Sequence, residues 1–185
     1  MNLLLRALQL YTPEYLRRRR LAELAAVTAG AFGCPAPDFG GLSGDERLRR
    51  YAEFTRAGVD EMIAGGQDLR LIHDRLYAGA FRIGNELRRQ LRVMTMADVM
   101  AAARVLYRGL GIDFRGTPSG DVLIARCYFS DVYSSDVCRV IAALDDGFLA
   151  GLAGGGRLIF LQRITEGYDH CRACFTCPER AERAT

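Results

Sequence analysis

The hydrophobic period of this 185-residue chain changes at Ile112, and this change constrains the fold more than any other feature. Before it, apolar residues recur at steps of three and four, the period of a helix with one buried face. After it come short β-rich runs bounded by turn residues. We expect a single α+β domain over 1–185, in which a helical half (1–111) packs on a small, mainly antiparallel sheet with one further helix between strands (112–178), followed by a tail (179–185).

Capping signals set the expected helix boundaries in the first half. Thr12 with Pro13 in the first helical position predicts a helix start, and Gly33 predicts its end. Ser43 and Glu46 fit a capping box, in which each side chain satisfies a free backbone donor of the other residue. A second helix should therefore begin there and run to 65–66.

A third helix should carry an apolar stripe over 69–91 and two internal glycines. Gly79 and Gly84 lower helix propensity, so we expect another backbone to pack closely against them. Thr95 and Asp98 form a box-like start for a fourth helix, which should end near 109–111.

The second half should contain strands over 121–129, 157–165 and 171–176, with a helix between the first two. That helix should begin at Ser134 or Ser135 and bury Ile141, Leu144 and Phe148. Cys138 and Asp145 are seven residues apart, two turns along one face, so we expect both to face one cavity.

Six cysteines form the second informative pattern, and three of them, Cys171, Cys174 and Cys177, are packed near the end before Pro178. Thiolates three residues apart can converge on one ion or cluster, so we expect these three sulfurs to lie on one side of the segment. Cys138 would supply the fourth ligand, with Cys127 as the alternative donor. Four thiolates suit zinc or an iron–sulfur cluster, and the sequence does not decide between them.

Charge and the missing lysine exclude several functions. All 25 basic residues are arginine, so a phosphate-binding P-loop and a Schiff-base lysine cannot operate. A net charge of +3 does not predict nucleic-acid binding, and the basic run at 17–20 is interpreted as a solvated helix face. No secretion signal or membrane span is recognised, so we expect a cytoplasmic protein with reduced thiols, no membrane partner and a small-molecule ligand or substrate. A homodimer is left open.

An enzymatic alternative rests on three titratable side chains of the second half. Asp145, Glu166 and His170 could supply the base and the acid for hydrolysis of a cyclic amidine or another C–N bond. In a binding domain, Glu166 would instead anchor its turn by pairing with Arg163 or Arg126. Serine-hydrolase and dinucleotide-binding motifs are absent from the sequence.

Several spaced motifs resemble two related families. They are the glycines of the segment 79–84, Ser135 to Cys138, the segment 147–152, and Glu166-Gly167 followed by Cys171 and Phe175. From about Arg75 onward the chain resembles the 4-vinyl reductase domain, a TRAPP-like ligand-binding module, and the L-2-amino-thiazoline-4-carboxylic acid hydrolase family. The resemblance implies an α+β domain with a pocket between helices and sheet, in which Cys138 and Cys171 match the recurrent cysteines. Cys174 and Cys177 depart from that pattern.

Overall fold

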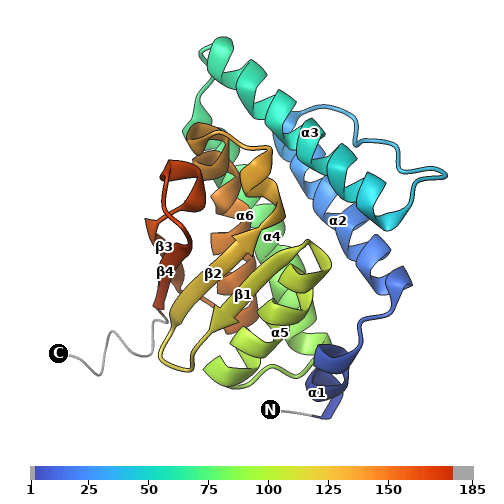
Figure 1. The fold of residues 1–185 in the computed structure, drawn as a ribbon, viewed down its shortest axis with the longest axis vertical. Coiled ribbons are helices and arrows are strands. Elements are labelled where there is room, and N and C mark those ends of the chain that lie inside the picture. Colours follow the sequence, from blue (N-terminus) through green and yellow to red (C-terminus); the bar gives the residue numbers. More distant parts are fainter. Residues whose placement is uncertain (1–2, 177–185) are drawn as a thin grey trace.

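The computed structural model describes residues 3–176, in which six α-helices and four strands form a helical layer on one sheet (Figure 1). The expected α+β class, with a helical first half and a helix between two strands, is confirmed. The helices are α1 (Leu3–Leu10), α2 (Glu14–Phe32), α3 (Gly44–Ala64), α4 (Leu69–Gln90), α5 (Met96–Gly109) and α6 (Ser135–Ala153).

The four strands pair antiparallel in the order β1-β2-β4-β3. Two short 3-10 helices, η1 (Tyr128–Asp131) and η2 (Ile164–Glu166), follow β2 and β3. Strand β1 was missed by the sequence analysis, and the other strands are close to the predicted runs. The strands are β1 (Ile112–Gly116), β2 (Asp121–Cys127), β3 (Arg157–Gln162) and β4 (Cys171–Thr176).

Most helix boundaries follow the predicted caps. The Ser43 hydroxyl accepts from the Glu46 amide while the Glu46 carboxylate accepts from the Ser43 amide, and Thr95 with Asp98 forms the same reciprocal pair at the start of α5. Gly33 ends α2 in the left-handed conformation, at φ 72°, which glycine adopts without steric cost. Helix α1 was not predicted.

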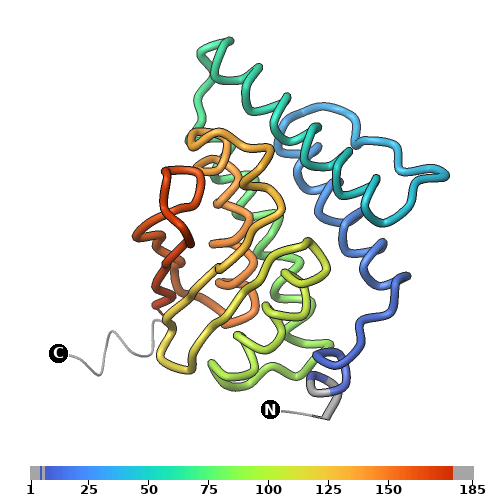
Figure 2. Tube along the Cα trace, in the orientation of Figure 1, coloured from blue at the N-terminus to red at the C-terminus, as the bar shows by residue number. Residues whose placement is uncertain are grey.

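The helices are arranged in two groups (Figure 2). Helices α4 and α6 lie side by side, with α6 packed on β3, and α2 and α3 form a hairpin beside them. Helix α5 leads directly into β1 and packs on it, with α1 against its outer side. In the part of the chain that the structure describes, no helix is both long and apolar enough to cross a membrane.

Glycines allow α4 and α6 to approach at backbone distance. A Cβ atom at Gly84 would lie 2.3 Å from the Phe148 carbonyl oxygen, and one at Gly151 would lie 2.3 Å from the Phe81 carbonyl oxygen. The prediction of a close backbone neighbour is therefore confirmed at Gly84. At Gly79 the near group is instead the Val27 side chain of α2.

Candidate functional site

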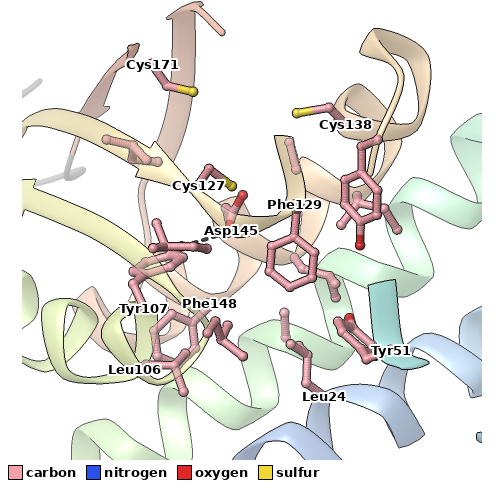
Figure 3. Close-up of a pocket in the computed structure, with 18 of the residues that line it drawn as sticks. Leu24, Tyr51, Leu106, Tyr107, Cys127, Phe129, Cys138, Asp145, Phe148 and Cys171 are labelled. Atoms are coloured by element: carbon pink, nitrogen blue, oxygen red, sulfur yellow. Dashed lines mark hydrogen bonds between the residues drawn. The ribbon is translucent and has the colours of Figure 1, made fainter. Parts of the chain in front are cut away.

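A mainly apolar cavity of about 100 Å³ lies between the helices and the inner face of the sheet (Figure 3). We call it the inner cavity. Its wall is built by α2 to α6 and all four strands, together with the segment that follows β2. Aromatic and aliphatic side chains make most of this wall: Leu24, Tyr51, Ile83, Leu106, Tyr107, Leu110, Ile112, Ile124, Phe129, Tyr133, Ile141, Leu144, Phe148 and Phe160.

Helix α6 presents the residues that the sequence analysis expected. The Ser134 hydroxyl accepts a hydrogen bond from the Val137 amide and so caps the helix start. Two turns apart, Cys138 and Asp145 both line the inner cavity, as their seven-residue spacing predicted. Leu144 and Phe148 are buried beside them.

Asp145 is the carboxylate of the inner cavity. Tyr107, from α5, donates a hydrogen bond of 2.8 Å to its Oδ1 atom. Burial raises the pKa of Asp145 from 3.8 to about 6, and the Tyr107 hydrogen bond and the positive charge of Arg163 oppose that rise only in part. The side chain keeps some accessible surface because it faces the cavity. Asp145 can therefore gain or lose a proton near neutral pH.

The other hydroxyl groups of the wall are paired within the core. Tyr51 shares a hydrogen bond of 3.0 Å with Thr28 of α2, and Tyr133 shares one with Thr55 of α3. Pairing removes the cost of burying these polar groups. Compared with these hydroxyl groups, the Asp145 carboxyl group is thus better placed to interact with a molecule in the cavity.

Three thiols also line the inner cavity, from three different elements. In Figure 3, Cys138 of α6 and Cys171 of β4 point toward one another, with Cys127 of β2 beside Asp145. Burial raises the pKa of Cys127 to about 12 and also raises the pKa values of Cys138 and Cys171. These groups are therefore protonated thiols at neutral pH and poor nucleophiles. Cys138 and Cys127 thus line the same cavity as Cys171, one of the three clustered cysteines for which they were the expected fourth ligands.

The expectation that Cys171 and Cys174 share one side of the chain is wrong. Both are in strand β4, where successive side chains alternate between the two faces. Cys171 is buried toward the inner cavity, whereas Cys174 pairs in register with Ile159, which is 53 % exposed on the outer face. An odd spacing in a strand separates side chains that a tight turn would bring together.

The predicted ligand Cys177 lies outside the described residues. Within residues 3–176, no group of three or more His, Cys, Asp and Glu side chains is arranged to hold a metal ion. The zinc or iron–sulfur site of Cys138, Cys171, Cys174 and Cys177 remains a prediction. The position of Cys174 on the outer face argues against Cys174 as a partner of Cys171 in that site.

Glu166 and His170 do not join Asp145 on the cavity wall. Glu166, in η2, accepts hydrogen bonds from Arg139 at 3.0 Å and from Arg163 at 3.5 Å, so it anchors its turn as expected for a binding domain. The His170 ring faces Asp169 at 2.5 Å. Among the described residues, the cavity wall includes Asp145 but neither of its two predicted catalytic partners.

Asp146, next to Asp145, has a structural role. Its Oδ1 atom accepts from the Leu158 amide at 2.7 Å, and its Oδ2 atom accepts from the Arg157 guanidinium at 2.9 Å. Asp146 therefore ties α6 to the start of β3. The two adjacent aspartates, which the sequence does not distinguish, face different surroundings.

The sequence analysis missed the residues that complete the wall from the first half. Tyr107, Tyr51 and Arg20 come from three helices, and only tertiary packing brings them to Asp145 and the thiols. Tyr107 offered one usable sequence signal. A buried tyrosine usually keeps its hydroxyl hydrogen-bonded, so a tyrosine near the end of an apolar helix indicates a polar partner inside the core.

Comparison with solved structures finds a similar fold. No family model matches the chain, and no curated protein matches it. A solved structure of trafficking protein particle complex subunit 3 from Naegleria fowleri, covalently bound to palmitic acid, aligns with a TM-score of 0.49 and 13 % identity. The alignment covers 72 % of this chain and 97 % of the other. The likeness is a coarse one of architecture.

Proposed function

We propose that this chain is a small-molecule-binding domain that holds an apolar ligand in the inner cavity. The observation that carries this proposal is the wall itself, because aromatic and aliphatic side chains enclose a space in which, among the described residues, Asp145 supplies the one carboxylate. Cavities of this composition bind through apolar contact and use a few polar groups to fix orientation.

Asp145 sets the orientation of the ligand. Below its pKa of about 6 the carboxyl can donate a hydrogen bond, and above it the carboxylate accepts one or faces a positive charge. A neutral or positively charged polar group of the ligand should lie at Asp145, with the apolar part against Phe148 and Ile141. Binding should therefore change with pH around that value.

Filling the cavity tests this function directly. Ala142 lines the inner cavity on α6, whereas Ala26 is exposed on α2. We expect Ala142→Phe to abolish binding of decanol or naphthalene in calorimetric titrations, and Ala26→Phe to leave it unchanged. Circular dichroism confirms that both variants fold. Absence of binding to the wild type, or equal binding by Ala142→Phe, would refute the proposal.

A C–N hydrolase is the second candidate, and one observation favours it. A carboxyl group with a pKa near neutrality inside a cavity can act as general acid or base. Glu166 and His170 would need to act from outside the cavity wall. Incubation of the full chain with L-2-amino-thiazoline-4-carboxylate decides this question. Turnover that Asp145→Asn abolishes would favour the hydrolase, and no turnover by the wild type would retire it.

The four-thiolate metal site is a separate proposal about the same chain. Its test is the metal content of the full chain purified without oxygen, together with its absorption spectrum. One zinc or one iron cluster per chain, lost in Cys138→Ser, would support the site. A wild type without bound zinc or iron would retire it and leave the apolar cavity as the functional feature.

A further inference from the structure

A second cavity, of about 290 Å³, adjoins the inner cavity on the side of α1. We call it the α1-side cavity. Its wall comes from α1, α2, α4 and α5 and from the residues next to them. Three side chains, Arg20, Leu106 and Leu110, line both cavities. They form the partition between the two spaces.

Arg20 is the charged member of this partition. Its side chain is 16 % exposed, and its guanidinium donates to Glu23 at 2.6 Å and to Gln90 at 3.3 Å. Glu23 also accepts from Arg19 at 2.9 Å, so the carboxylate is shared between two guanidinium groups. Arg20 therefore keeps donor capacity toward the cavities that it borders.

Negative and positive groups are unevenly distributed over the two cavity walls. The α1-side cavity is lined by Arg17 and Arg20, and its other lining residues among those described are uncharged. The inner cavity has Asp145 together with three protonated thiols, and Arg20 lies at its border with the α1-side cavity. Leu24, one turn after Arg20 on α2, lies at the opposite end of the view in Figure 3 from Cys138 and Cys171. An anionic group is favoured at the arginine end and disfavoured beside the ionised Asp145.

We propose that the two cavities form one elongated site for a single-chain amphiphile with an anionic head. The apolar chain occupies the inner cavity, and the head binds Arg20 at the partition. A guanidinium is suited to this role because it presents several donors in a plane and pairs with a carboxylate or a phosphate through two hydrogen bonds. In this proposal the Arg20 side chain, which pairs with Glu23 and Gln90 in the structure, rotates toward the α1-side cavity and so connects the spaces. This inference rests on the proposed function of the inner cavity.

Neutral and anionic ligands of equal chain length distinguish the contribution of the head group to the affinity from that of the apolar chain. Decanol, decanoate and decyl phosphate are titrated into the full chain below their aggregation concentrations, with displacement of neutral Nile red as the readout. We expect both anions to bind more tightly than decanol at a pH above the Asp145 pKa of about 6. Tighter binding of decyl phosphate would assign a phosphate head, and tighter binding of decanoate would assign a carboxylate head.

Arg20→Gln is the decisive variant, and Arg19→Gln is its matched control. Arg19 also pairs with Glu23 but lines neither cavity. Loss of one charge-assisted contact should weaken binding of both anions about tenfold and leave decanol within about twofold, while Arg19→Gln changes neither. Thermal denaturation checks that both variants fold.

Glu23→Gln tests the same inference by a gain of affinity. It removes the carboxylate that competes for Arg20, so the anions should bind more tightly and decanol should not. Equal weakening of decanol and the anions by Arg20→Gln, or no effect on either, would overturn the head-group assignment. If decanol also fails to bind the wild type, the proposed function of the inner cavity itself is refuted.

Discussion

The Tyr107 hydroxyl donates a 2.8 Å hydrogen bond to the Asp145 carboxylate across the wall of the inner cavity. This contact joins α5 to α6. It also lowers the pKa of Asp145 and so partly offsets the increase that burial causes. Tyr107 is itself fixed by a stacked contact with Phe114, whose ring centroid is 4.8 Å away. The polar group of the cavity is thus held by an aromatic side chain that is itself packed on the sheet.

Asp145 should make the stability of the protein depend on pH. Its folded pKa is raised, so its contribution is fully present below the unfolded value of 3.8 and is lost as the pH rises through about 6. At about 1.4 kcal/mol per pKa unit, the difference between 3.8 and about 6 corresponds to a loss of roughly 3 kcal/mol in the free energy of unfolding. Urea denaturation of wild type and Asp145→Asn over this range checks it. Relative to the wild type, Asp145→Asn should gain stability as the pH rises, and a constant difference would contradict the raised pKa.

Phe148→Ala should destabilise the protein by about 3 kcal/mol, the lower end of the range for a buried phenylalanine. Phe148 is 5 % exposed and makes an edge-to-face contact with Tyr107, but it also borders an existing cavity, so fewer contacts are lost. Denaturant titration measures the change. A loss close to zero would show that this face of α6 is not part of the core.

Gly84→Ala should be strongly destabilising because its new Cβ atom would lie 2.3 Å from a backbone oxygen of α6. Backbone atoms cannot yield as a flexible side chain can, so α4 and α6 must separate. Gly30→Ala in α2 is the matched control, since a Cβ atom there meets nothing within 4 Å. It should stabilise the helix by about 0.5–1 kcal/mol. Similar melting temperatures for the two variants would contradict the close contact.

Asp146→Ala should cost roughly 2–4 kcal/mol, because it leaves the buried Leu158 amide without its acceptor and removes the Arg157 contact. Asp136→Ala, on the same helix, removes an exposed pair with Arg139 and should change stability by less than about 0.5 kcal/mol. Thermal and urea denaturation of both variants test the difference. Equal effects would show that Asp146 does not tie α6 to β3.

Local signals in the sequence determined much of the fold. Ser43, Thr95 and Gly33 mark helix ends because capping groups act within a few residues. The seven-residue spacing of Cys138 and Asp145 placed both on one helical face, since the helix period is a local property. The short strand β1 was missed because Ile112–Gly116 gains its strand conformation by pairing with β2, a long-range contact with little local signal.

Tertiary structure alone decided what these residues face. The sequence does not distinguish the adjacent Asp145 and Asp146, yet Asp145 lines the inner cavity and Asp146 binds the start of β3. The spacing of Cys171 and Cys174 predicted a pair of metal ligands, but side chains alternate along a strand, so the two cysteines lie on opposite faces of β4. Arg20 joins the site only because α2 packs beside α4 and α5. Spacing along the chain fixes which side chains share an element's face, whereas the packing of elements distant in sequence fixes what that face meets.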